Sequence, residues 1–263
     1  MNDKTRLAWR IITILAVLVL LVYGVFQLIA WTSDSKQLEQ EVLDRYGRAE
    51  SFVPVADGTI PPERLERFIR VRRAVHPACV ELQLVMDGIV GMASIEDDPD
   101  LPGEEAARRG IKGVKSAMKA GSRMLQLMDA RNSALLEEDM GLGEYLYLYL
   151  AAYSDQLARV ESSPYVELEE SRISNRTREE FIQMLGNQLD APGSGSLGDV
   201  RMALEEEIQS LQESELTTPW THGLLPRTRE SLSPRQDELD GLYCDGVVAI
   251  ELLQKNRGFN FGG

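Results

Sequence analysis

The feature that most constrains this chain is an apolar run near its N-terminus, residues 11–30, which contains no charged side chain. Twenty residues of helix, at about 1.5 Å each, match the thickness of a bilayer core, about 30 Å. Trp9 and Trp31 bracket the run at the depth where indole rings favour the membrane interface. The run therefore predicts a transmembrane helix over 11–31, preceded by a short tail over 1–10.

A cleaved signal peptide and a buried core helix are the alternatives. The hydrophobic region of a signal peptide is about 7–15 residues long and ends at small residues. This run is longer, it continues into LIAWTSDS, and no cysteine follows it at the position that a lipoprotein anchor needs. We therefore expect an uncleaved signal-anchor that crosses the membrane once.

The charged flanks of the run predict its orientation. Lys4, Arg6 and Arg10 precede it, whereas Lys36 and Arg45 are the two basic residues in the fifteen that follow Trp31. Basic flanks favour the cytoplasmic side. The predicted location is therefore the cell membrane, with the N-terminus cytoplasmic and the larger part extracytoplasmic, or periplasmic in a Gram-negative bacterium.

The extracytoplasmic part is strongly acidic. The whole chain has a net charge of −14, and the tail before the span is basic, so the remainder is still more negative. A domain of this sign repels polyanions on average. We therefore expect no nucleic-acid partner.

The rest of the chain predicts helices. Apolar residues recur at steps of three and four, and convincing alternation of apolar and polar residues is missing. The expected fold class is all-α, with the transmembrane helix followed by a helical-bundle-like extracytoplasmic domain of about six helices. We expect four segments after the span: a stalk and extended linker over 32–61, the main helical domain over 62–190, a flexible linker over 191–198 and a C-terminal helical pair over 199–263.

Three stretches of the sequence give most of the support for the all-α prediction. Apolar spacing continues across Pro77, which predicts one long kinked helix or two helices in line. The stretch 142–160 is apolar nearly all round its first turns, which is typical of a buried central helix. The stretch 104–137 carries a heptad seam, which is either internal or the interface of a homo-oligomer. The seam runs over 107–135 through Ala107, Ile111, Val114, Met118, Gly121, Leu125, Met128, Asn132 and Leu135.

The two cysteines, Cys79 and Cys244, lie far apart in the sequence. An even number of cysteines outside the cytoplasm permits one disulfide. Their separation excludes a CxxC redox or zinc motif. Two separately buried thiols are the alternative, because cysteine is often a core residue.

Patterns that carry catalysis are missing from the sequence. The two histidines, His76 and His222, belong to no zinc-binding pattern, and GxSxG does not occur. The glycine-rich GSGSLG lacks a lysine, and the acidic DDPD lacks the ligand pattern of an EF-hand. We therefore expect no metal, no cofactor and no catalysis. An envelope hydrolase with a hidden carboxylate pair is the least favoured hypothesis.

Two helix faces are candidates for binding. Basic residues without an acidic neighbour line the helix over 106–128, although pairing with acidic side chains inside the domain is the alternative. Tyrosines at a spacing of four share a second face. This face is either a binding surface or a part of the core. The basic face consists of Arg108, Lys112, Lys115, Lys119 and Arg123, and the tyrosine stripe of Tyr145, Tyr149 and Tyr153.

The leading hypothesis is a single-pass membrane protein that acts by protein–protein interaction, as a scaffold, assembly or accessory factor of the cell envelope. The alternative is a module that binds the membrane surface or an anionic polymer through the basic helix 106–128. Both hypotheses include one membrane span and leave the partner unidentified.

Overall fold

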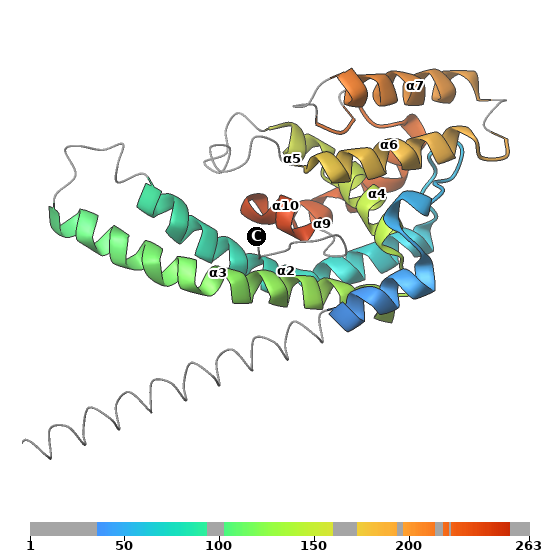
Figure 1. The fold of residues 1–263 in the computed structure, drawn as a ribbon. Helices are drawn as coiled ribbons and strands as arrows, with labels where there is room; N and C mark the ends of the chain where they lie inside the picture. The colour runs from blue at the N-terminus through green and yellow to red at the C-terminus, as the bar shows by residue number, and fades with distance from the viewer. Residues whose placement is uncertain are drawn as a thin grey trace, which may run out of the picture.

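A computed structural model of the chain is shown in Figure 1. It describes residues 36–93, 103–159, 173–193, 197–213, 218–220 and 222–252. The predicted tail and transmembrane helix over 1–31 lie outside these ranges. Within them, every helix is too short or too polar to cross a membrane. The regular structure of the described part is entirely helical, which confirms the all-α prediction.

Two long helices that pack against each other form the largest element (Figure 1), α2 (Pro62–Ala93) and α3 (Gly103–Glu137). Pro62 opens α2, where the missing N–H of proline costs no hydrogen bond. Pro77 lies inside α2, which is one helix rather than two. The distal halves of both helices project beyond the rest of the molecule (Figure 1).

The central helix is α4 (Leu142–Ala152), in which every residue except Glu144 is buried. This burial is what its all-round apolar surface predicts. The chain then breaks at Tyr153 and resumes as the short α5 (Ser154–Ala158). A single cluster of buried apolar residues extends from Val42 to Leu252 around α4.

The segment after residue 199 differs from the prediction of a helical pair. The second half of this segment is interrupted over residues 241–244, and its buried residues belong to the same cluster as those of α4. Gly241 follows α9 at this interruption, and glycine weakens a helix interior. The elements of this half are α6 (Asn175–Leu189), α7 (Gly198–Glu213), α8 (Pro226–Leu232), η5 (Ser233–Arg235), α9 (Gln236–Asp240), η6 (Asp245–Val247) and α10 (Val248–Glu251).

The predicted stalk and linker over 32–61 is also corrected where it is described. Residues 36–46 are helical, η1 (Ala49–Ser51) follows, and the extended stretch to Pro61 lies on the body of the protein. The amide of Gln188 donates to the Val55 carbonyl at 2.8 Å. A side chain at Gly58, which has a φ of +79°, would lie 2.7 Å from Leu225. The stretch is therefore a fixed part of the domain, because α6 and α8 satisfy its backbone groups.

Candidate functional site

The predicted basic face lies on the projecting part of the helix pair, which we call the arm: residues 77–93 of α2 and 103–126 of α3. Lys119 is exposed. Arg123 forms an ion pair with Glu81 across the two helices and also donates to Gln126 at 2.6 Å. Arg123 therefore ties the arm together, so internal pairing accounts for this member of the face.

The other members of the basic face, Arg108, Lys112 and Lys115, lie on the helical backbone of α3. Their side chains are outside the described part of the chain. Their role in binding therefore stays a prediction.

The arm also exposes apolar side chains that the sequence analysis did not single out. Val80 and Leu84 lie one turn apart on α2 and are 39% and 63% exposed. Residues four apart share a helix face. Single exposed apolar residues are ordinary, but this pair lies on an element that already projects from the body.

The C-terminal part of the heptad seam, which lies nearest the body, is inside the domain. Met128, Asn132 and Leu135 are buried, Leu125 is half-buried and Gly121 is exposed. A side chain at Gly121 would meet nothing within 4 Å. A homo-oligomer through the seam over 107–135 stays a prediction.

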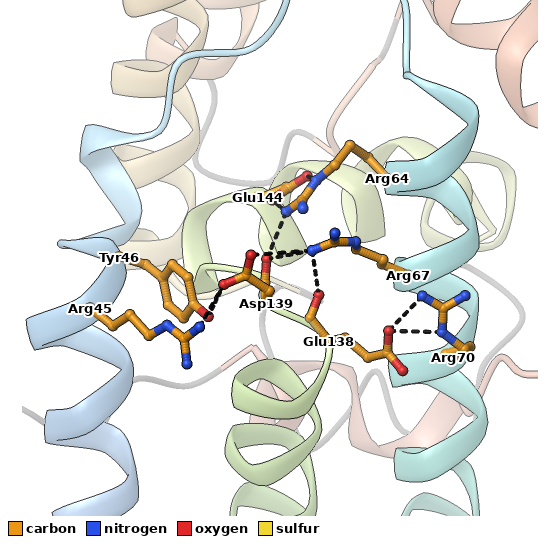
Figure 2. A network of polar contacts seen from close by, with 8 residues as sticks. All are labelled: Arg45, Tyr46, Arg64, Arg67, Arg70, Glu138, Asp139 and Glu144. Carbon is orange, nitrogen blue, oxygen red and sulfur yellow. Dashed lines mark hydrogen bonds and ion pairs between the residues drawn. The ribbon is translucent and has the colours of Figure 1, made fainter.

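A cluster of charged side chains surrounds the turn between α3 and α4, and we call it the corner (Figure 2). It brings together the helix 36–46, the start of α2 and the turn itself. Its members are Arg45, Tyr46, Arg64, Arg67, Arg70, Glu138, Asp139 and Glu144.

Asp139 is the centre of the corner. Its carboxylate accepts hydrogen bonds from the Tyr46 hydroxyl at 2.8 Å, from Arg45 at 2.9 Å and from Arg67 at 3.3 Å. Its φ of 52° is left-handed, a conformation that aspartate tolerates better than most residues. The hydrogen bond from Tyr46 lowers the pKa of Asp139 despite partial desolvation, so this carboxylate is ionised at neutral pH.

Two further arginines of α2 complete the corner. Arg64 donates to both oxygens of Glu144, and to the Asp139 carbonyl at 3.1 Å. Arg70 donates to Glu138 at 2.7 Å and thereby lowers the pKa of that carboxyl. Exposed pairs contribute little singly, but together they join three distant segments. The corner therefore fixes the helix that follows the predicted membrane span against the start of α2 and the end of α3.

The tyrosine stripe does not form a surface. Tyr145, Tyr149 and Tyr153 are each 0% exposed, so the prediction of an interaction face there is corrected. The reason is the apolar surface of α4, which places all sides of this helix in the core. The three rings instead surround the side chain of Arg72, which comes from α2.

Arg72 is the centre of this buried polar cluster. It donates from Nε to the Tyr153 hydroxyl at 3.0 Å and from Nη1 to the Tyr145 hydroxyl at 2.8 Å. Its guanidinium lies over the ring of Tyr149, 5.0 Å from the centroid, a favourable cation–π geometry. Burial disfavours its charge, but the oxygens of Tyr145 and Tyr153 outweigh this effect and raise the pKa of Arg72. Arg72 therefore stays charged.

Glu251 of α10 supplies the counter-charge. It forms an ion pair with Arg72, accepts a hydrogen bond from Tyr145, and is itself 0% exposed. Arg131 of α3 donates to the Glu251 carbonyl oxygen. Burial raises the pKa of Tyr153 to about 12, so this hydroxyl remains protonated. The cluster thus holds α10 against α2, α3 and α4.

The sequence patterns described above single out neither Arg72 nor Glu251. A usable signal was present for Arg72, because it occupies the same apolar stripe of α2 as Phe68, Val75 and Cys79. A charged residue at such a position is rarely buried unless it is paired. For Glu251, no comparable signal distinguishes it from the other acidic residues.

Cys79 and Cys244 are paired in the structure, with Cα atoms 6.3 Å apart, a separation within the ordinary range for a disulfide. The pair joins α2 to the turn before η6. His76 lies beside it, with Nδ1 3.7 Å from the Cys244 sulfur. In the described part of the chain, no group of three histidine, cysteine or acidic side chains could hold a metal ion.

Comparison with protein-family models, with curated proteins and with solved structures finds no match for the chain. Its function therefore has to be inferred from the residues themselves.

Proposed function

We propose that the chain is a single-pass, membrane-anchored protein of the cell envelope that acts by binding another protein through the arm. It would serve as a scaffold, assembly or accessory factor rather than as an enzyme. The observation that carries the proposal is the exposed pair Val80 and Leu84, which lies on the projecting part of α2.

The chemistry of the arm suits a protein partner. Its residues on α2, 77–93, extend for about 25 Å at 1.5 Å per residue, which is long enough for a docking element. The exposed apolar pair would lie at the centre of a contact, and Lys119 at its polar rim. Such a partner would present an apolar patch next to acidic groups.

The corner supports the same proposal. It holds the root of α2 to the helix 36–46 through Arg67 and Asp139 on one side and Arg45 on the other. The predicted membrane span ends shortly before this helix. A partner bound to the arm would therefore be held at a fixed place relative to the anchor.

The experiment that tests the proposal is photo-crosslinking in intact membranes, with a photoreactive residue at position 84 or at position 119. We expect discrete adducts with one protein from both positions. Met202 on α7 is the matched control, because it is 58% exposed and apolar but lies away from the arm. The absence of adducts from the arm, or the same adducts from position 202, would reject the arm as the contact element.

The substitution Leu84→Glu separates the proposal from its alternative. Because it removes the apolar contact and leaves the lysines in place, it should abolish the protein adduct at position 119. If adducts at 119 are with lipid and persist in this variant, the basic helix binds the membrane surface instead. Replacing Lys112, Lys115 and Lys119 with Gln should then release the domain from anionic vesicles.

A further inference from the structure

A second region of the molecule has the form of a small-molecule site. A cavity of about 400 Å³ opens between α5, α8 and the turn at Trp220. Ligand sites in proteins have volumes of about 300–1,000 Å³. Alanines at positions 151, 152 and 158 line one side of the cavity, and their small side chains leave this space.

Two opposite charges line the cavity, Arg229 from α8 and Asp155 from α5. Within the described part of the chain, neither side chain has an ion-pair or hydrogen-bond partner, so they lie more than 4.0 Å from each other. Arg227, two residues earlier, does pair with Glu230 at 3.0 Å. Both residues are exposed, so the cavity presents a separated pair of opposite, solvent-accessible charges.

Other polar groups at the cavity are also unpartnered. Ser154 lines it, is 9% exposed, and its hydroxyl has no partner in the described part of the chain. Trp220 lines it too, is 5% exposed, and its indole Nε1 is buried without a hydrogen bond. A buried polar group without a partner is costly in a protein interior, and a polar ligand in the cavity would reduce that cost.

The backbone around the cavity is held in an uncommon shape. Trp220 has a φ of 62°, which is strained for a bulky residue. Its N–H donates to the buried Glu207, which holds this conformation in place. Gly223 has a φ of +90°, and a side chain there would lie 3.2 Å from Nη2 of Arg229. Glycine therefore leaves room for the guanidinium at the cavity wall.

We propose that this cavity binds a small zwitterion, a free α-amino acid or a short peptide. Its carboxylate would pair with Arg229, its ammonium group with Asp155, and its apolar part would lie on the alanine side. The net charge of the chain, −14, opposes binding of an anion, whereas a zwitterion carries no net charge. This site is separate from the arm and does not depend on the proposed function.

The test is isothermal titration of the full chain in detergent micelles with L-leucine, L-phenylalanine and L-alanyl-L-leucine. We expect saturable binding of at least one probe. Arg229→Gln and Asp155→Asn should each weaken it about tenfold or more, as the loss of a charge-assisted hydrogen bond does. Arg227→Gln is the matched control and should bind like the wild type, because Arg227 lies outside the cavity. Unchanged unfolding temperatures would show that the variants are folded.

Analogues that lack one charge distinguish a site for zwitterions from a site that binds a carboxylate or an ammonium group alone. N-acetyl-leucine lacks the ammonium group and leucine amide lacks the carboxylate, so both should bind the wild type more weakly than leucine. Equal binding of N-acetyl-leucine would overturn the role of Asp155. No saturable binding of any probe, or equal binding to the Arg229→Gln variant, would overturn the site itself.

Discussion

The ion pair between Arg72 and Glu251 gives the sharpest prediction about stability. Both side chains are 0% exposed. The substitution Glu251→Gln keeps the shape of the side chain but removes its charge. Arg72 then remains charged in the core without a counter-charge, because a guanidinium does not lose its proton in proteins. The variant should therefore be strongly destabilised.

The contacts that Arg72 keeps in this variant determine how much stability is lost. Breaking a buried pair by removing one partner costs about 3–5 kcal/mol. Arg72 would still donate to Tyr153, to Tyr145 and, at 2.6 Å, to the Leu242 carbonyl. We therefore expect the lower end, about 3 kcal/mol. In a domain of this size, this loss corresponds to a fall of about 6–12 °C in Tm.

The assay is a double-mutant cycle, with unfolding of the oxidised full chain in micelles followed by circular dichroism. Because Arg72→Met removes the stranded charge, Arg72→Met/Glu251→Gln should cost less than the two single changes together. The neighbouring pair Arg73 and Glu238 is the matched control, since Arg73 is 55% exposed and such a pair is worth less than about 1 kcal/mol. A loss for Glu251→Gln as small as in this control, or strictly additive effects, would refute the reasoning.

Four further predictions concern the stability of the domain. Gly143→Ala should cost about 2–3 kcal/mol, because its Cβ would lie 2.3 Å from the Ala49 carbonyl oxygen. Gly186→Ala, in a helix with open space around that position, should instead raise stability by about 0.5–1 kcal/mol; thermal unfolding tests both. The hydrogen bond from the Tyr46 hydroxyl lowers the pKa of Asp139 in the folded protein. The ionised Asp139 therefore stabilises the fold at any pH above its pKa in the unfolded chain, and this stabilisation is lost as the pH falls through its lower pKa in the folded protein. Asp139→Asn should therefore lower Tm at neutral pH, and the difference should shrink in acid below 3.8. Finally, Cys79→Ser should cost about 2–5 kcal/mol, and a reductant should lower the Tm of the wild type but not of the variant; a wild-type Tm that is insensitive to reductant would mean that the two thiols are not bonded.

The long helices could be predicted from the sequence because their patterns are long. The steps of three and four in α2 and α3 extend over many turns, and the apolar surface of α4 indicates a central place. Short elements gave weaker signals. Thr177 to Glu180 resembles a capping box, yet the N-cap of α6 is Ser174, whose hydroxyl accepts from the Thr177 N–H at 3.1 Å.

The polar contacts could be predicted less well, for a physical reason. Helical spacing places Arg64, Arg67 and Arg70 near one another on α2, but their partners lie about seventy residues away in the sequence. Which turn meets this face is decided by the packing of the whole core. The tyrosine stripe shows the same limit, because a spacing of four assigns a shared face without saying what covers it.

The connections of α2 to the rest of the body explain why the arm, and not another element, is the better docking candidate. The residues of the corner bind the side chains of Arg64 and Arg70. Farther along α2, Arg72 pairs with Glu251 and Cys79 is bonded to Cys244. These connections extend along α2 as far as Cys79, in the first turn of the arm. Beyond them, the Glu81–Arg123 pair joins α2 to α3 within the arm. A helix pair that is firmly fixed at its root and exposes apolar residues beyond it can bind a partner without rearranging its own core, which keeps the entropic cost of association low.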